Sequence, residues 1–551
     1  MLDSATVETV ARAPIRARSA EEGAFQISWL SALLPLALML VCFSSGLGAL
    51  GLTGPDEPRY AAIARNMARS GDWVTPRLNG QPWFEKPVLY YWSAAFAFRW
   101  FGDGEFAMRL PSVLAAILAT LAAAWAALRA YGLDAARLTL LMLPATVALA
   151  GFSHAAAPDM LFSGFLTAAS VAAAEMLQKP RAGMLSQLAL GAFLGAATLA
   201  KGPAAVLLAG GATLLWALAS RQLTAAFRFF QPACLAAFAV TAVPWYALCA
   251  VRNPEFLRIF FLEHNLERYL TPVFQHPQPF WFFVPISLAA VLPWTVLLIP
   301  LGLDALRARS DGRWRHSPSL FFACWAITPI LFFSFSESKL PGYILPSVPP
   351  LILILAATLA RRLSPAGDSP RVWVALIAAT FPLLSLAAVY WLRRLPADLG
   401  PPAAGDWLGL LGLAAAGGLV CALLAWVRRE RAATTAVAIL MAALVFGAAM
   451  SVLPMLDPHL SARTAARVTS EAPGAAASVS VLGVDRWLPL GLEFYLDRPV
   501  PPWTPGASSP LWIWTTAARA AELQQAGLRY TVVRKLSQEA WLVRMDNPPS
   551  P

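Results

Sequence analysis

Long apolar runs dominate this chain, and most of its polar residues fall between them. A window of about 20 residues, the length an α-helix needs to cross a bilayer, finds thirteen such runs. They lie near residues 28–52, 108–128, 136–153, 159–177, 184–200, 203–220, 230–250, 280–303, 318–335, 343–360, 372–392, 407–427 and 432–453. The pattern predicts an all-α polytopic membrane protein, because membrane β-strands would alternate apolar and polar residues over short segments instead.

The pattern changes after residue 453, where Asp, Arg, Pro and Ser return. Alternating runs at Ala477–Leu482, Leu511–Thr515 and Tyr530–Val533 predict strands, and Ala517–Ala526 predicts a helix between two of them. The last segment of the chain is therefore expected to fold as a small α/β domain. The complete organisation that we predict is a cytoplasmic tail at 1–27, a transmembrane domain at 28–453 with periplasmic loops 53–107 and 252–279, and a periplasmic α/β domain at 454–551.

Charge fixes the expected orientation. The chain carries 42 Lys and Arg against 31 Asp and Glu, a formal net charge of +11. Basic residues collect in short loops on one side, for example at 221–228 and 428–431, as the positive-inside rule predicts for cytoplasmic loops. Membrane lipids, and no nucleic acid, are therefore the expected partners of this charge. The five cysteines lie within apolar runs without metal-ligand spacing, which predicts that they pack in the core.

The first long external loop begins with the segment 54–60, GPDEPRY. We predict a helix over residues 58–70 that ends at Gly71 and lies in the membrane interface, with Asp56 as its cap. Capping alone would explain Asp56. The alternative is functional, because two adjacent carboxylates, Asp56 and Glu57, at the mouth of an apolar bundle favour a substrate or catalytic site.

Aromatic residues crowd the next part of that loop, the segment 81–92, QPWFEKPVLYYW. Trp83 and Tyr90 could belong to an interfacial belt or form a stacking wall for a sugar ring or an isoprenyl chain. Glu85 and Lys86 would be partly desolvated there and need specific partners. A lysine ammonium is suited to a phosphate.

Further polar residues are expected on the same side. Asp159 starts a span and could be only a cap, and Lys201 ends another and could only snorkel. The external segments 263–269 and 336–343 are also polar. We predict that donors from these segments and the first loop converge on one phosphate: Lys86, Arg268, Lys339 and Tyr343. Glu85 and His264 could alternatively hold a divalent metal.

Taken together, these motifs resemble a known family. DEPRY at 56–60, EKPVLYYW at 85–92, Asp159, KGP at 201–203 and SKLPGY at 338–343 are similar to those of the GT-C glycosyltransferases. Within that class the chain resembles the protein mannosyltransferase-like branch, and specifically the bacterial 4-amino-4-deoxy-L-arabinose transferases that modify lipid A. The resemblance extends over the membrane region and the C-terminal domain.

The resemblance implies an inverting transfer of 4-amino-4-deoxy-L-arabinose from undecaprenyl phosphate to a lipid A phosphate. It places the active site at the periplasmic face of the bacterial inner membrane and links the activity to polymyxin resistance. The family's catalytic position falls on Asp56, and its second external acid on Asp159. Lys86 and Lys339 would bind the lipid phosphate. The remaining expected substrate contacts are Glu57, Arg59, Tyr60, Trp83, Glu85, Tyr90, Lys201, Arg268 and Tyr343.

Two other functions remain open at this stage. One is a protein O-mannosyltransferase that uses polyprenyl-phosphate mannose. The other, which is not an enzyme, is a transporter of lipid-linked sugars, although a transporter would place charges at mid-membrane in broken helices rather than at external helix ends. We expect a monomer and no required cofactor, with a divalent metal as the alternative. The residues alone leave the donor sugar and the acceptor undetermined.

Overall fold

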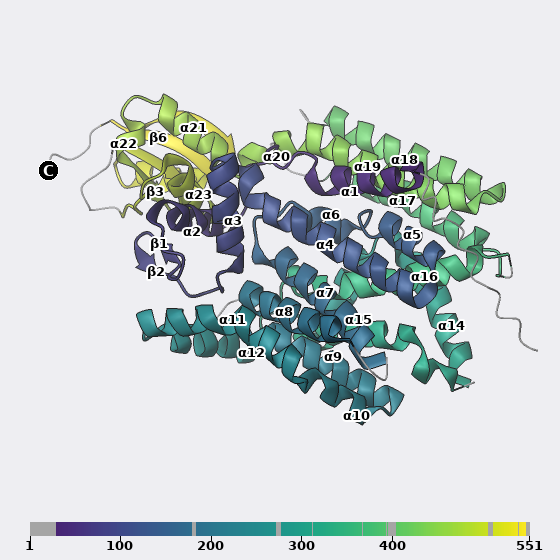
Figure 1. Ribbon diagram of the computed structural model, residues 1–551. Helices are drawn as coiled ribbons and strands as arrows, with labels where there is room; N and C mark the ends of the chain where they lie inside the picture. The colour runs from purple at the N-terminus through teal and green to yellow at the C-terminus, as the bar shows by residue number, and fades with distance from the viewer. Residues whose placement is uncertain are drawn as a thin grey trace, which may run out of the picture.

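Helices form the body of the molecule, and a small sheet lies at one end (Figure 1). The structure is a computed structural model that describes residues 29–178, 183–271, 277–310, 312–365, 367–392, 394, 404–504, 511–537 and 539–546. The predicted fold class, a polytopic helical protein with a C-terminal α/β unit, is confirmed. The predicted tail, 1–27, lies outside the described residues.

The helices of the body have the following bounds: α1 (Trp29–Ser44), α4 (Glu105–Tyr131), α5 (Leu133–Met142), α6 (Val147–Ser153), α7 (Pro158–Gln178), α8 (Met184–Lys201), α9 (Ala204–Ser220), α10 (Leu223–Ala226), α11 (Pro232–Arg252), α13 (Phe283–Ala290), α14 (Leu298–Ser310), α15 (Pro318–Ser334), α16 (Val348–Leu363), α17 (Arg371–Leu392), α18 (Ala404–Trp426) and α19 (Glu430–Gly447). Shorter helical segments join them: η1 (Phe227–Phe230), the π-helix η2 (Arg258–Glu267), α12 (Arg268–Leu270), η4 (Phe280–Phe282), η5 (Trp294–Leu297), η6 (Arg313–His316), η7 (Pro341–Ser347) and η8 (Ala448–Val452).

The predicted spans coincide with apolar helices. Within the described chain, eight helices are long and apolar enough to cross a membrane, or up to ten if two bent pairs each form one span. Three shorter apolar helices, namely part of α1 and all of α9 and α15, coincide with the other predicted spans. The difference from the prediction is bending, by 57° between α5 and α6 and by 108° after α13. Pro144 and Pro293 lie at these breaks, where a proline ring cannot continue the helical hydrogen bonds.

The first long loop is an ordered layer made of α2 (Asp56–Ser70), a hairpin of β1 (Arg77–Leu78) and β2 (Gln81–Pro82), and α3 (Leu89–Phe101). The predicted helix and its end at Gly71, which has a φ of 73°, are confirmed. The predicted cap is wrong: the N-cap residue is Pro55, and Asp56 lies in the first helical turn. Tyr60, Ala64 and Met67 are buried where α2 packs against α3, so protein covers this apolar face.

The C-terminal unit comprises α20 (Leu453–Leu460), α21 (Arg463–Glu471), α22 (Ala475–Ser478), β3 (Val479–Leu482), α23 (Trp487–Leu496), β4 (Trp512–Thr515), α24 (Ala517–Gln525), β5 (Tyr530–Ser537) and β6 (Ala540–Met545). Its sheet has the order β3-β4-β6-β5, with β3 parallel to β4 and the other pairs antiparallel. The strands and the helix predicted here are found, whereas β6 and the helices α20, α21, α22 and α23 were not predicted. Helix α23 packs on α2, so this unit lies directly against the first loop (Figure 1).

Candidate active site

A chain of ion pairs links the start of α2 to the loop before α3. The carboxylate of Asp56 lies 2.5 Å from the guanidinium of Arg59. The same guanidinium forms a second ion pair with Glu85, at 2.9 Å. The side chain of Asp56 is 53% exposed, whereas those of Arg59 and Glu85 are 7% and 10% exposed. Of the two carboxylates in this series of ion pairs, Asp56 is therefore the one that a bound substrate can reach.

Glu85 is surrounded by positive charge. Lys86 Nζ lies 3.5 Å and Arg268 Nη1 3.3 Å from its Oε1. Burial alone would raise the pKa of Glu85, but Lys86, Arg59 and Arg268 together lower it to about 2. Burial also lowers the pKa of Lys86, although Glu85 opposes that shift. Glu85 is thus a permanent anion that holds three cations in place.

The second predicted carboxylate, Asp159, lies in the first turn of α7. Lys201, the last residue of α8, approaches its Oδ1 to 2.5 Å and lies 4.7 Å from the centroid of the Tyr343 ring. Residue 342 must be glycine for this packing, since a Cβ there would lie 3.0 Å from Asp159 Oδ1 and 2.9 Å from the Phe152 ring. Asp159 and Lys201 therefore form an internal pair, beyond the capping and snorkelling alternatives.

A cavity of about 400 Å³ brings most of the predicted basic residues together. Its polar lining includes Lys86, Lys201, His264, Arg268 and Tyr343, and its apolar lining includes Leu207, Phe261, Leu266, Leu270 and Phe332. Burial alone would lower the pKa of Arg268, but Tyr343 and Glu85 raise it. A cavity with cations at one part and aliphatic and aromatic side chains at another matches a phosphate attached to a hydrocarbon chain.

The structure does not bring Lys339 into this cavity. Its side chain is buried, and its ammonium donates to the backbone carbonyl of Ser336. Lys339 is not among the residues that line the cavity. The described geometry therefore favours a structural role for Lys339 over the expected phosphate contact. Lys339 holds the turn that precedes η7, and η7 carries Gly342 and Tyr343.

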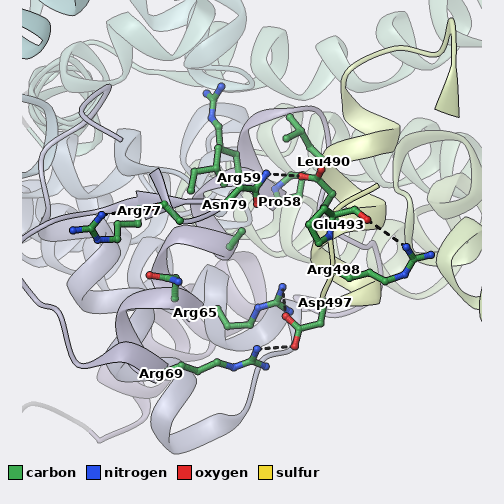
Figure 2. A pocket seen from close by; sticks show the side chains of 15 residues that line it. Pro58, Arg59, Arg65, Arg69, Arg77, Asn79, Leu490, Glu493, Asp497 and Arg498 are labelled. Atoms are coloured by element: carbon green, nitrogen blue, oxygen red, sulfur yellow. Dashed lines mark hydrogen bonds and ion pairs between the residues drawn. The ribbon is translucent and has the colours of Figure 1, made fainter. Parts of the chain in front are cut away.

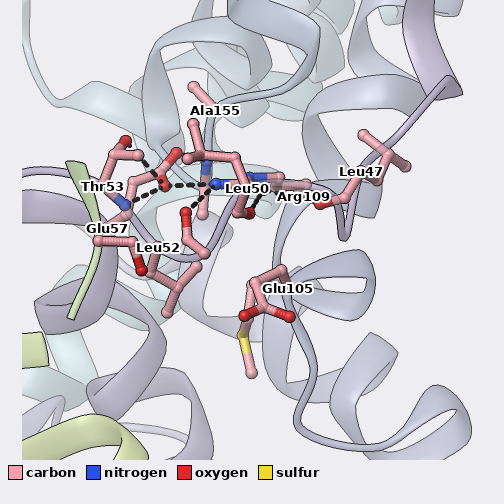
Figure 3. A network of polar contacts seen from close by, with 12 residues as sticks. Leu47, Leu50, Leu52, Thr53, Glu57, Glu105, Arg109 and Ala155 are labelled. Atoms are coloured by element: carbon pink, nitrogen blue, oxygen red, sulfur yellow. Dashed lines mark hydrogen bonds and ion pairs between the residues drawn. The ribbon is translucent and has the colours of Figure 1, made fainter. Parts of the chain in front are cut away.

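Glu57 forms a buried network of its own, separate from Asp56 (Figure 3). Its Oε2 accepts hydrogen bonds from the Thr53 backbone N–H at 2.8 Å and from Arg109 at 2.9 Å, and its Oε1 accepts from the Ala156 N–H at 2.6 Å. Arg109 also donates to the carbonyls of Leu47, Leu50 and Gly51. With these contacts made, Glu57 is placed to join the Asp56 helix to the segment before Asp159, rather than to touch substrate.

The predicted aromatic wall divides into two parts. Tyr60 and Tyr90 are buried with ring centroids 6.0 Å apart, and the Tyr90 hydroxyl donates to the Met108 carbonyl. These two rings therefore hold α2, α3 and α4 together. Trp83 is different, because its ring lies 5.3 Å from the Arg59 guanidinium and its Nε1 is buried without a partner in the described chain. Trp83 is the aromatic residue best placed for a sugar.

The structure adds no third ligand from the described residues to the metal site that was considered at Glu85 and His264. Among the described residues, no group of three or more His, Cys, Asp or Glu side chains is arranged to hold a metal ion. Burial lowers the pKa of His264, which keeps its imidazole neutral, and Glu85 is already surrounded by Arg59, Lys86 and Arg268. This positive surrounding disfavours a divalent cation on Glu85.

Several residues that shape the site were not predicted from the sequence. Asp457 accepts from the Gly51 N–H at 2.7 Å, Tyr495 accepts from the Leu52 N–H at 2.8 Å, and Arg463 donates to the Gly48 carbonyl. All three belong to the C-terminal unit, on α20, α23 and α21 respectively. Arg109, the partner of Glu57, was not predicted either, but the sequence does contain an indication of its role. It is a charged residue just inside the apolar run 108–128, where a charge usually has a specific partner.

Comparison with known proteins gives a consistent result. Residues 31–260 match the family model described as dolichyl-phosphate-mannose-protein mannosyltransferase. The undecaprenyl phosphate-alpha-4-amino-4-deoxy-L-arabinose arabinosyl transferase of Edwardsiella ictaluri is 35% identical over 58% of this chain and 57% of its own length. The protein of the same name from Pseudomonas aeruginosa is 35% identical over 62% of each chain. The chain thus aligns with about six tenths of the length of these curated relatives.

The similarity of structure extends further along the chain. The crystal structure of ArnT from Cupriavidus metallidurans bound to undecaprenyl phosphate superposes with a TM-score of 0.75 and 28% identity, over 94% of this chain and 97% of that one. The apo structure of the same protein gives a TM-score of 0.74. The similarity therefore includes the membrane body and the C-terminal unit.

Proposed function

We propose that this chain is a GT-C membrane glycosyltransferase of the branch related to protein mannosyltransferases, to which it is similar, and that it transfers a sugar from a polyprenyl phosphate carrier. The observation that supports this most is the cavity lined by Lys86, Lys201 and Arg268 on one part and by apolar side chains on the other. The proposed donor is undecaprenyl phosphate 4-amino-4-deoxy-L-arabinose, and the proposed acceptor is a lipid A phosphate.

The proposed step needs charge at two places. The bond between the anomeric carbon and the carrier phosphate breaks, a bond to an oxygen of the acceptor phosphate forms, and undecaprenyl phosphate leaves with the electron pair. Lys86 and Arg268 would stabilise the negative charge that grows on the carrier phosphate. Their buried surroundings strengthen that effect, and Glu85 fixes both cations before the substrate arrives.

The sugar itself gains positive charge in the transition state. Glycosyl transfer passes through an oxocarbenium-like state, which a nearby carboxylate stabilises. Asp56 fits this role because it is exposed, and because Arg59 orients it. An acceptor phosphate is already anionic near neutral pH, since its second pKa is about 6, so Asp56 would stabilise and orient rather than remove a proton.

The remaining residues would support these two centres. Asp159 and Lys201 form the wall beside Tyr343, and Lys201 extends the positive lining of the cavity. The amino group of the sugar needs an anionic or aromatic partner, and we assign the aromatic contact to Trp83. The chain is a multi-pass membrane protein by its apolar helices and its relatives. We place it in the bacterial inner membrane with this site facing the periplasm.

The matching family model also favours a second candidate, transfer of mannose from a polyprenyl phosphate to a protein hydroxyl. That reaction differs physically, because a hydroxyl must lose a proton, and Asp56 would then act as a general base. The activity of such an enzyme would depend on pH through that base.

Mass spectrometry of lipid A tests the proposal directly. The purified chain is incubated with lipid A and either undecaprenyl phosphate aminoarabinose or undecaprenyl phosphate mannose, with Asp56→Asn as the inactive control. Aminoarabinose added to lipid A in the wild-type reaction alone is the expected result. Lipid A that stays unmodified, while a Ser- or Thr-containing protein acceptor gains mannose, would establish the second candidate instead.

A further inference from the structure

A second positively charged depression lies outside the cavity described above. It is a cleft of about 270 Å³ between α2 with the following hairpin and α23 of the C-terminal unit (Figure 2). Arginines dominate its lining: Arg59, Arg65, Arg69, Arg77 and Arg498. The lining also contains Asn66 and Asn79, and its carboxylates are Glu493 and Asp497. The lining therefore carries an excess of positive charge.

Four of the five arginines of the cleft have carboxylate partners among the described residues, and Arg498 is the exception. Asp497 is shared by Arg65 at 3.1 Å and Arg69 at 2.7 Å, both of which also approach Asp103, and Arg77 lies 3.8 Å from Asp72. Arg498 donates to the backbone carbonyls of Pro499 and Ala475, and no carboxylate of the described chain pairs with it. Its Nε and that of Arg59 are buried without a hydrogen-bond partner in the described residues. Buried donors of this kind normally have an acceptor.

Arg59 connects the cleft to the candidate active site. It lines the cleft, and it also pairs with Asp56 and Glu85. A ligand bound in the cleft would therefore lie next to the start of α2, where the exposed carboxylate of Asp56 is. The cleft is also bounded by the C-terminal unit, which so far has no assigned role in binding.

We propose that this cleft binds a second phosphate of the acceptor glycolipid while its first phosphate is glycosylated beside Asp56. The inference rests on the proposed function and adds a recognition element to it. Planar guanidinium groups bind phosphate oxygens in pairs, and the Asn66 side chain offers a neutral donor to the sugar hydroxyls beside a phosphate. The cleft is too polar for an acyl chain, and its excess of arginine disfavours a cationic ligand.

Equilibrium binding of fluorescent lipid A to the full-length protein in detergent, without any sugar donor, tests this. The probes are diphosphoryl and monophosphoryl lipid A with the same acyl chains, and inorganic phosphate as competitor. The variant is Arg77→Ala combined with Arg498→Ala, which leaves the Asp56 and Lys86 clusters untouched. The matched control is Arg467→Ala on α21 of the same unit, whose side chain is 71% exposed.

The double variant is expected to weaken binding of diphosphoryl lipid A about 10- to 100-fold and to leave monophosphoryl lipid A within about twofold, because each charge-assisted contact contributes roughly a factor of ten. Arg77→Lys with Arg498→Lys should restore part of the affinity, which separates lost charge from misfolding. Equal weakening of both lipids, no weakening, or inorganic phosphate that binds as tightly as the glycolipid would each overturn the proposal.

This binding test is independent of turnover. If diphosphoryl lipid A shows the expected discrimination but is never glycosylated, the proposed transfer fails, and the cleft remains a binding site for a lipid A phosphate. If lipid A is glycosylated but the double variant binds it normally, the cleft proposal fails and the proposed function stands.

Discussion

Two aspartates on the same side of the molecule have different surroundings, and this difference assigns them different roles. Asp56 is half exposed and contacts one guanidinium, whereas Asp159 is 22% exposed and lies 2.5 Å from the Lys201 ammonium. A carboxylate that must stabilise a developing cation has to be reachable by the substrate. Asp56 meets this condition, and Asp159 is better suited to fixing the position of Lys201.

Replacement of Asp56 by Asn should lower kcat by about 10²- to 10³-fold, the usual loss when one stabilising group of a transition state is removed. The KM of the donor should change little, because Lys86 and Arg268 remain. Asp134→Asn is a matched control, since Asp134 also lies in a first helical turn, pairs with an arginine three residues later and is 53% exposed. Steady-state kinetics of both variants decide the matter, and a fully active Asp56→Asn protein would make Asp56 structural.

The charge on Glu85 makes stability depend on pH in the acid range. Its pKa of about 2 lies below the ordinary value near 4.3, so its stabilising effect is complete at neutral pH and is lost as pH falls from about 5 towards 2. The shift corresponds to about 3 kcal/mol. Thermal melting in detergent should show Glu85→Gln less stable than wild type at pH 7, with the difference shrinking below pH 4. A difference independent of pH would contradict this account.

At the scale of elements, local patterns predicted what local contacts determine. The periodicity of α2 and the glycine after it are properties of one segment, and so are the alternating strands near residues 479, 512 and 530. The bends after α5 and α13 were not predictable, because they depend on packing between segments. The same holds for Lys339, whose ammonium donates to the Ser336 carbonyl instead of lining the cavity. The cluster of Lys86, Arg268 and Tyr343 was predicted because its members share one side of the membrane.

The Glu57–Arg109 network fixes α2 relative to the segment before α7, so it should act on catalysis through position. Glu57→Gln is expected to lower the free energy of unfolding by about 3 kcal/mol, because a buried charge loses its partner. The same variant should lower kcat with little change in donor KM, since Asp56 shifts while the carrier cavity persists. Kinetics and melting curves of the purified variant measure both effects.

Glu175→Gln serves as the control for that experiment. Glu175 pairs with Arg129 between α7 and α4, but Arg129 is 50% exposed, so the loss should stay below about 1 kcal/mol. A Glu57→Gln protein that melts lower yet turns over normally would show that the network stabilises the fold without positioning Asp56.

At the scale of the whole molecule, the C-terminal unit and the first loop pack together as one layer at the end of the helical body (Figure 1). We place this layer in the periplasm, because the short basic loops lie at the other ends of the spans. Alkaline phosphatase fused to the C-terminus of the full chain should therefore be active in cells, since the enzyme folds only outside the cytoplasm. A fusion that is inactive, while a cytoplasmic fluorescent reporter at the same position is bright, would reverse the topology.

The hydrogen bonds from Asp457 and Tyr495 to the backbone of Gly51 and Leu52 join residues 406 and 443 positions apart. The segment that leads into Asp56 leaves the ribosome early, yet its partners are made near the end of synthesis. At about 5–20 residues per second, roughly 20–90 s separate the two events. Throughout that interval the nascent chain is in the membrane with its reactive segment incomplete. We therefore expect a chain truncated before residue 457 to be inactive, because the segment that leads into Asp56 would lack both partners.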